Sequence, residues 1–398
     1  MSPCSKREYL ATIHKRYKQA DRKGKTAILD EFCQNCGHHR KHAIRLLSQV
    51  RRRPKAAPRK PGKPSRYGIP GLLKVLEDIW LAAGMPCGKR LKCVLPAWLP
   101  YYGETFGGVD LKVILALKKI SAPSLDRLLA PARRKHKTVA LSTTKAGTLL
   151  RHHIPVKTGQ WEESEPGFLE ADTVAHCGNS TAGQYVNTLD AVDIATSWTE
   201  QRAVWGKGEK DVLEQLEDIE NSLPFPLKGL DTDNGGELLN WHVVKYCQER
   251  KKPVQFTRSR PYKKDDNAHI EQKNFTHVRQ WTGYDRFDRS VIKDLLNDVY
   301  KNELRLFQNF FIPSMKLLEK RRVRSKIIKK HDKAKTPYQR VLEHPSVSPQ
   351  NKAKLTKIFQ KLNPFKLRLA IDKKLAKIRS LASKSPLKLN PSLGNILQ

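Results

Sequence analysis

The stretch "GLDTDNGGELLN", residues 229–240, places three carboxylates within seven positions, at Asp231, Asp233 and Glu237. A short apolar run precedes these acids and Asn-Gly-Gly follows, so the pattern predicts a β-strand that ends at a turn. Asp231 and Asp233 are two positions apart and therefore share a face of that strand. Glu237 is expected in the first turn of the next helix, where the helix dipole favours an acid.

The segments around this strand alternate between strand and helix patterns. Stretches rich in Val, Thr, Trp and Tyr with Gly-containing connections predict three antiparallel strands, and amphipathic helices then alternate with two further strands. The order βββ-α-β-α-β-α predicts a mixed sheet with helices on its faces. The expected strands cover 167–177, 185–196, 197–206, 227–233 and 253–259, and the expected helices cover 209–223, 238–251 and 268–283.

The formal charge of +37 is unevenly distributed along the 398 residues. Residues 161–250 hold 18 Asp and Glu against 6 Lys and Arg, whereas residues 315–398 hold 23 Lys and Arg against 4 Asp and Glu. Basic surfaces favour polyanions, because neutralising phosphates releases counterions. An acidic region within such a chain indicates divalent metal held against phosphate, which a purely structural nucleic-acid binder does not require.

Residues 1–50 have the pattern of a helix-turn-helix DNA-binding domain, with two amphipathic helices before a basic one. Ala43, Ile44, Leu46 and Leu47 are the expected inner face of the basic helix. A small helical bundle with a solvated basic face is the alternative. Residues 51–68 hold four prolines and eight Lys or Arg, which predicts an extended basic linker that can follow DNA. The expected DNA contacts are Arg40, Lys41, Arg45, Arg51, Arg52 and Arg53.

The remaining chain divides by pattern into three parts. Residues 69–145 are expected to form a second helical DNA-binding module, residues 160–290 a catalytic core, and residues 291–398 a basic, partly helical C-terminal region. The chain lacks the long apolar run of a membrane helix, so no membrane partner is expected. Its seven cysteines are irregularly spaced and indicate free thiols. We expect a location in the bacterial cytoplasm, in association with the nucleoid.

Three separate elements offer acids for a metal site. They are Asp172 in the first strand, Asp231 or Asp233 at the end of the fourth, and Glu271 in the helix after the basic loop. Carboxylates converging from such elements can hold Mg²⁺, which activates an oxygen nucleophile and stabilises the leaving oxygen in phosphodiester chemistry. Glu170 shares a strand face with Asp172 and is the alternative there. Each acid also has a structural interpretation, as a surface or turn residue.

Basic residues border the third acid. The segment 257–267 and the helix after it are expected to contact DNA phosphates, because they adjoin Glu271. A solvated charge run is the alternative. On that helix Glu271 shares a side with Asn274. The expected contacts are Arg258, Arg260, Lys263, Lys264, Lys273 and Arg279.

Three short motifs in order carry a resemblance to a known family. "ADTV" at 171–174, "TDNGGE" at 232–237 and "NAHIEQKN" at 267–274, with 38 positions from Asp233 to Glu271, resemble the integrase catalytic core of DDE transposases from bacterial insertion sequences, relatives of retroviral integrases. The resemblance implies an α/β fold with an RNase H-like mixed-sheet core (βββαβαβα) and flanking helix-turn-helix modules. It selects Asp233 over Asp231, and it implies that Asp172, Asp233 and Glu271 bind two Mg²⁺ or Mn²⁺ ions.

The resemblance also implies an activity. A transposase of this kind frees a 3′-hydroxyl at a transposon end and joins it to target DNA by transesterification. The implied partners are double-stranded DNA, as terminal repeats and target, and further copies of the chain in a multimer. An RNase H-like nuclease and a non-catalytic DNA-binding relic of a transposase remain as alternatives. A recombinase with a covalent nucleophile is disfavoured, because it would leave the three acids unexplained.

Overall fold

The computed structural model divides the chain into two compact units, Met1–Arg66 and Tyr67–Gln398. The structure describes residues 1–48, 66–136, 164–206, 208–232, 237–258, 270, 273–323 and 326–383.

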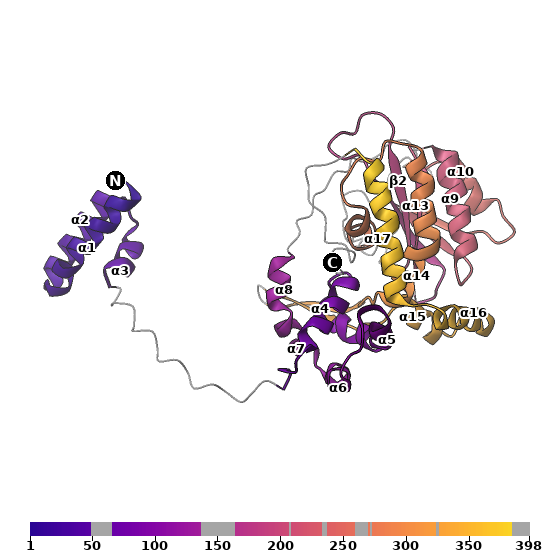
Figure 1. The fold of residues 1–398 in the computed structure, drawn as a ribbon. Helices are drawn as coiled ribbons and strands as arrows, with labels where there is room; N and C mark the ends of the chain where they lie inside the picture. Colours follow the sequence, from indigo (N-terminus) through magenta and orange to yellow (C-terminus); the bar gives the residue numbers. More distant parts are fainter. Residues whose placement is uncertain are drawn as a thin grey trace. The chain divides into compact units, whose positions relative to one another are not determined.

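The first unit consists of three helices, α1 (Pro3–Gln19), α2 (Arg22–Cys36) and α3 (Arg40–Ser48) (Figure 1). Side-chain caps start the first two, because Ser2 accepts a hydrogen bond from the amide of Ser5 and Asp21 from that of Gly24. Gly37 ends α2 at φ 65°, a left-handed conformation that glycine adopts without strain. The small core contains Ile13, Ile28, Leu29, Phe32, Cys36, Ala43 and Leu47.

The inner face of α3 differs from the expected one at one position. Ala43 and Leu47 are buried, but Ile44 is 41% exposed. Ala43 and Leu47 are four positions apart and so lie on one side of the helix, whereas Ile44 is turned away from them.

The second unit is built around a five-stranded sheet with the strand order β3-β2-β1-β4-β5. β2 pairs antiparallel with both β1 and β3, and β4 pairs parallel with both β1 and β5. The predicted mixed sheet and its order of elements are therefore confirmed. The elements are β1 (Phe168–Ala175), β2 (Val186–Asp193), β3 (Thr199–Trp205), α9 (Glu209–Ser222), β4 (Gly229–Thr232), α10 (Trp241–Gln248) and β5 (Gln255–Arg258).

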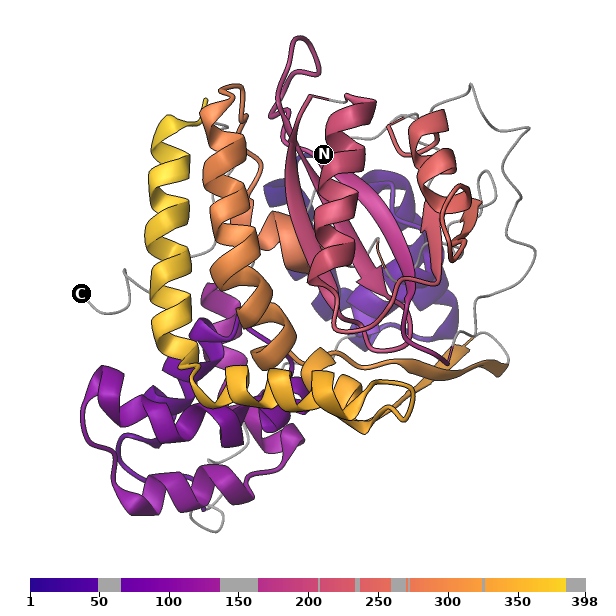
Figure 2. The same cartoon turned by 90° about the vertical axis from the view of Figure 1, so that its right-hand side faces the viewer.

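The two faces of this sheet differ in chemistry. One face is apolar and packs with α9 and α10, which lie side by side in both views (Figure 1 and Figure 2). Leu169, Leu189 and Leu230 belong to that face. Because side chains alternate along a strand, the residues between them lie on the opposite face. That opposite face, called the polar face below, holds Glu170, Asp172, Thr188, Asp190, Gln201, Asp231 and Thr257.

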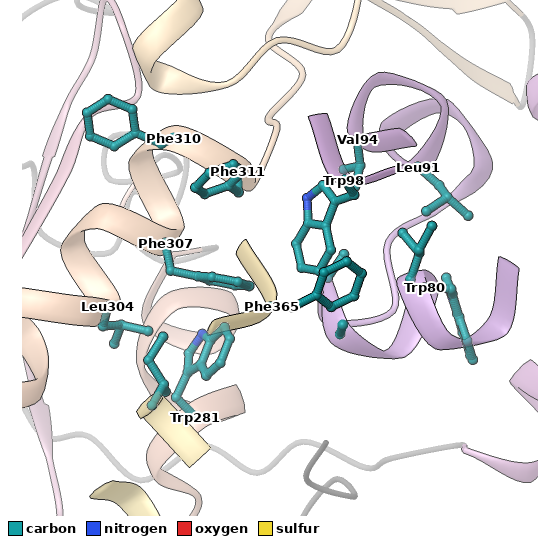
Figure 3. Packing of buried hydrophobic residues seen from close by; sticks show 14 of the residues in the cluster. Trp80, Leu91, Val94, Trp98, Trp281, Leu304, Phe307, Phe310, Phe311 and Phe365 are labelled. Carbon is teal, nitrogen blue, oxygen red and sulfur yellow. The ribbon is translucent and has the colours of Figure 1, made fainter. Parts of the chain in front are cut away.

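Helices from before and after the sheet share one hydrophobic core. The Trp98 ring meets the edges of Phe307, Phe311 and Phe365, with ring centroids 5.8, 6.3 and 4.8 Å apart (Figure 3). The region expected as a second DNA-binding module thus packs against later helices of the same unit. The helices are α4 (Leu72–Ala82), α5 (Gly88–Phe106), α6 (Leu111–Lys119), α7 (Ala122–Leu128), α8 (Ala130–Lys135), α13 (Val291–Val299), η2 (Tyr300–Leu304), α14 (Arg305–Phe311) and α17 (Pro364–Leu381).

The C-terminal region contains a β-hairpin that the sequence pattern does not predict. Its strands are β6 (Leu317–Val323) and β7 (Lys326–His331), paired antiparallel. α15 (Pro337–Glu343) and α16 (Pro349–Gln360) follow and lead into α17. The helix after β5 is described from Lys273 and includes the π-helical segment η1 (Asn274–Arg279) and α12 (Gln280–Thr282).

Candidate active site

Asp172 lies on β1 and contacts the helix that follows β5. Its Oδ1 accepts a hydrogen bond from the Thr173 amide at 2.7 Å, and its Oδ2 accepts one from Asn274 Nδ2 at 2.6 Å. Asn274 is the first residue of η1 and lies three positions after Glu271. The bond to Asn274 therefore holds the start of η1 against the strand that carries Asp172.

β4 pairs in parallel with the part of β1 that precedes Asp172. Glu170 pairs in register with Asp231, and Ala171 pairs with Thr232. Thr232, the last residue of β4, therefore lies beside the residue that precedes Asp172. Asp233 and Glu271, the other two predicted ligands, lie outside the described residues. Over the described part of the chain, no group of three or more His, Cys, Asp or Glu is arranged to hold a metal ion.

Glu170 and Asp231 are fully buried on the polar face. Glu170 Oε2 accepts a hydrogen bond from the amide of Ile270 at 3.1 Å, and Asp231 Oδ1 accepts one from Thr257 Oγ1 at 2.6 Å. Such buried acids are stabilised by the bonds they accept. Glu170 thus connects β1 to Ile270, and Asp231 connects β4 to β5.

Glu237 occupies a position different from the expected one. α10 begins only at Trp241, where Asn240 caps it by accepting a hydrogen bond from the Val243 amide. Glu237 lies before that cap in a turn, and its Oε1 accepts a hydrogen bond from Thr173 Oγ1 at 2.7 Å. The prediction of a first-turn helix acid is therefore wrong, because the asparagine cap starts the helix later.

Asp190 on β2 is directly opposite Asp172 in the antiparallel register and lies on the same face. It is fully buried. Burial raises the pKa of the Asp190 carboxyl, and the charge of Lys273 opposes that rise. Burial likewise lowers the pKa of the Lys273 ammonium, and the charge of Asp190 opposes that fall. The two residues are thus a buried pair that attract each other electrostatically beside Asp172, while the direct partner of Lys273 Nζ is His277.

Lys273 corrects one of the predicted DNA contacts. Its side chain is 8% exposed, and its Nζ lies 2.9 Å from His277 Nε2. Arg258 is 6% exposed, and Arg279 donates to the carbonyls of Ala175 and Gly283 at 2.5 and 3.3 Å. Burial removes Lys273 and Arg258 from the surface that a phosphate could reach. Arg279 is half-buried, and DNA contact by it stays a prediction. Arg260, Lys263 and Lys264 lie outside the described residues.

The segment η1 is a π-helix, and two glutamine side chains donate hydrogen bonds to one of its backbone carbonyls. The carbonyl oxygen of His277 accepts hydrogen bonds from Gln201 Nε2 at 3.0 Å and from Gln308 Nε2 at 2.8 Å. Gln201 belongs to β3 and Gln308 to α14, so both are remote in sequence. Sequence reasoning missed these residues and Asp190, because each acts through a long-range contact.

The N-terminal unit keeps the predicted basic residues of α3 on its surface. Arg40 is exposed and forms an ion pair with Asp30, and Lys41 is exposed. Arg45 is exposed and lies 3.0 Å from His42 Nδ1. DNA binding by these residues stays a prediction. Arg51, Arg52 and Arg53 lie outside the described residues.

No family model matches the chain. It has a distant likeness to the crystal structure of the catalytic core domain of BIV integrase, with 12% identity over 48% of this chain and 98% of that chain and a TM-score of 0.30. None of the helices in the described ranges is both long and apolar enough to cross a membrane.

The sequence comparison finds a nearer relative. The chain is 37% identical over 334 residues to the uncharacterized protein y4rM of Sinorhizobium fredii. The match covers 83% of this chain and 93% of that protein, so it extends over most of both chains. Identity and coverage of this extent establish common membership, and this chain belongs to the family of the uncharacterized protein y4rM.

Proposed function

We propose that this chain is a transposase of the DDE type with an RNase H-like core, which cleaves DNA at the ends of a mobile element and joins the freed 3′-hydroxyl to target DNA. One observation carries the proposal: Asn274 Nδ2 lies 2.6 Å from Asp172 Oδ2. Glu271 is three positions before Asn274, and residues so spaced share a side of a helix. The contact therefore favours the convergence of Glu271 and Asp172.

A second contact and the strand pairing of β4 bear on the approach of Asp233. Thr173, the residue after Asp172, donates to Glu237 at 2.7 Å. Glu237 follows Asp233 by only four positions in the chain. The side chains of Asp172 and Thr173 point to opposite faces of the sheet, so this contact supports only the position of the β4–α10 connection along β1. The pairing of Ala171 with Thr232 supports the approach of Asp233 to Asp172, because the position after Thr232 would continue the polar face.

The donor set fits Mg²⁺ or Mn²⁺, expected as two ions. Carboxylate oxygens are the ligands these ions prefer, and the polar face gathers carboxylates beside Asp172. Asp172, Asp233 and Glu271 would hold the ions, which supply activation of the attacking oxygen and neutralisation of phosphate charge.

The partners in this proposal are double-stranded DNA, as terminal repeats and target, and further copies of the chain on paired DNA ends. Arg40, Lys41 and Arg45 support DNA reading by α3, because they are exposed on one short basic helix. A chain with a formal charge of +37 would associate with the nucleoid of the cell.

The test is an end-cleavage assay with the full chain. Purified protein is incubated with Mg²⁺ and DNA that carries the ends of the element encoding it, and nicked and joined products are separated on a gel. We expect both products from the parent chain and from the control Asp294→Asn, whose side chain is 74% exposed on α13. We expect neither product from Asp172→Asn, which retains DNA binding.

The outcomes separate the alternatives. Equal activity of Asp172→Asn and the parent would overturn the assignment of Asp172. Nicking without joining by the parent would identify an RNase H-like nuclease. DNA binding with no product in Mg²⁺ or Mn²⁺ would identify a non-catalytic relic.

A further inference from the structure

The paired strands β6 and β7, residues 317–323 and 326–331, are called the basic ribbon here. Their sequences, LLEKRRV and KIIKKH, hold six Lys or Arg and one acid, Glu319. Figure 2 shows the two strands running out beneath the five-stranded sheet. A two-stranded ribbon with this excess of positive charge differs from the strands of the five-stranded sheet, whose polar face is acidic.

Three cations of the ribbon, Arg321, Lys329 and Lys330, have exposed side chains. Like charges that are close together on a two-stranded surface repel one another. Glu319 lies 3.8 Å from Arg321, and both side chains are more than half exposed, so this ion pair offsets little of the charge. The ribbon by itself is therefore a surface whose repulsion a polyanion would relieve.

The base of the ribbon is fixed to the second unit. The amide of Lys316 donates to Asp332 Oδ1 at 2.7 Å, and the amide of Asp332 donates to the carbonyl of Lys316 at 2.9 Å. Lys316 Nζ donates to the carbonyl of Ile194 at 2.6 Å, and Arg340 forms an ion pair with Asp332 at 2.7 Å. These bonds hold the strands as a pre-organised arm, which lowers the entropy lost on binding.

The anchor lies away from the candidate active site. Ile194 follows β2, and its amide bonds to the carbonyl of Phe168 at the start of β1. Asp172 is four residues farther along β1, a separation of roughly 13 Å at the rise of a strand. DNA held by the ribbon is therefore not the same few nucleotides that contact Asp172.

Exposed apolar side chains accompany the charges of the ribbon. Leu317, Leu318 and Ile328 are 47%, 62% and 43% exposed. A second copy of the chain could cover them, but two copies would bring two basic ribbons together. A DNA major groove, about 12 Å wide, admits a two-stranded ribbon and offers thymine methyl groups to apolar side chains. Charge complementarity therefore favours DNA over a second copy.

We propose that the basic ribbon binds double-stranded DNA in the major groove, at a distance from the reacting phosphate. The term "reacting phosphate" rests on the proposed function, whereas binding by the ribbon does not. The ribbon binds DNA that flanks the reacting phosphate. Loss of the ribbon's charges therefore weakens DNA binding, but the rate of the chemical step on DNA that is already bound stays the same.

The test uses the full chain and a 30-base-pair duplex DNA without metal ions. Fluorescence anisotropy gives Kd over a range of salt concentrations for the parent and for Arg321→Gln/Lys329→Gln/Lys330→Gln. We expect Kd to rise at least tenfold at physiological salt. We expect the slope of log K against log salt to shrink by about 0.9 for each phosphate that the variant no longer neutralises. An unchanged Kd and slope would overturn the proposal.

A matched control removes the same charge elsewhere. Lys354→Gln/Lys357→Gln/Lys361→Gln alters three exposed lysines of α16 and its C-terminal cap. We expect a much smaller rise in Kd for this control than for the ribbon variant. Equal rises in Kd for the two triple variants would mean that only the total charge matters, and this result would refute the proposal. Duplex RNA should be insensitive to the ribbon variant, because its major groove is deep and narrow. Equal sensitivity to the variant on RNA would contradict groove binding.

Self-association is tested separately. Sedimentation of Leu318→Ser/Ile328→Ser without DNA should match that of the parent. If the parent self-associates and this variant does not, a second copy covers the ribbon and the proposal falls. Asp172→Asn should bind the duplex as the parent does. The binding assay does not require catalysis. Even if the parent chain is inactive in the cleavage assay, its Kd for the duplex still tests the proposal for the ribbon.

Discussion

Asn274 Nδ2 donates to Asp172 Oδ2 over 2.6 Å and thereby joins η1 to β1 across 102 positions of the chain. Asn274 does not need to touch DNA or metal to matter for chemistry. A side chain that holds a carboxylate fixes the direction of the lone pairs that carboxylate offers. In this contact the amide occupies one oxygen of Asp172 and limits how the carboxylate can turn.

Replacing Asn274 with Leu should lower activity and leave the fold intact. The substitution keeps the branching at Cγ and removes the donor, so we expect a 10- to 100-fold slower cleavage rate, the usual loss for a residue that orients a metal ligand. Asn302→Leu is the control, because Asn302 donates to Asp298 at 2.8 Å on the surface. Single-turnover cleavage checks both. Equal rates in the two variants would show that the Asp172 contact has no role in orientation.

The buried pair of Asp190 and Lys273 should behave as a unit in stability measurements. Asp190→Asn or Lys273→Met removes the electrostatic attraction that opposes the effect of burial on the other group, so we expect each single variant to lower the free energy of unfolding. The double variant removes both charges and should recover at least half of the sum. Urea unfolding at pH 7 measures the coupling, and Asp294→Asn at the exposed pair with Lys293 should cost less than about 1 kcal/mol. Strict additivity of the two single losses would contradict the pairing.

The interactions of Glu220 should make the unfolding free energy of the second unit fall at acidic pH. Burial raises the pKa of Glu220, but hydrogen bonds from Arg250, at 2.5 and 2.9 Å, and from Tyr246 outweigh it and hold the pKa below its usual value of 4.5. A depressed pKa in the folded state means that the carboxylate stabilises the fold above pH 4.5. This stabilisation is lost as pH falls through the folded pKa.

We therefore expect Glu220→Gln to lose about 1.5–3 kcal/mol of unfolding free energy at pH 7, the range for hydrogen bonds to a charged group. The difference from the parent should be smaller at pH 3, because the carboxylate takes up a proton as pH falls through its folded pKa. Glu217→Gln, at an exposed position of the same helix, should change little at either pH. Urea unfolding at the two pH values measures this. A Glu220→Gln deficit that is constant with pH would contradict the assigned interaction.

Removal of the first unit should separate recognition from folding. Its core is made of its own residues, so a chain that starts at Tyr67 should unfold at the same urea concentration as the second unit of the parent. If α3 reads the ends, the shortened chain should lose its preference for them over random DNA in a competition assay. An unchanged preference would overturn the helix-turn-helix assignment.

The sheet was predictable from sequence because its pattern is local. Strand and helix periods alternate within short windows, and the expected strands overlap β1 to β5. The basic ribbon was missed because Lys and Arg fill the positions at which a local strand pattern would show apolar residues. Only the partner strand reveals the pairing of Lys320 with Lys329.

The candidate site was predictable only in part. Asp172 stands in a short motif, and Asn274 shares the side of Glu271 by helix spacing alone. Asp190 could not be found in this way, because its place opposite Asp172 depends on the register of two strands. Lys273 was assigned to the surface because lysine usually lies there. Its burial follows from the packing of η1 on a polar sheet face, which no local pattern encodes.

The contact between Trp98 and Phe365 has a consequence for how the cell makes this protein. The two rings lie 4.8 Å apart, yet synthesis must add 267 residues after the tryptophan before the phenylalanine exists. At the usual elongation rate that interval is about 13–53 s. Throughout it α5 emerges from the ribosome without its final packing partner. The core of the second unit can therefore close only after Phe365 has been added, and the apolar side of α5 lacks this partner until then.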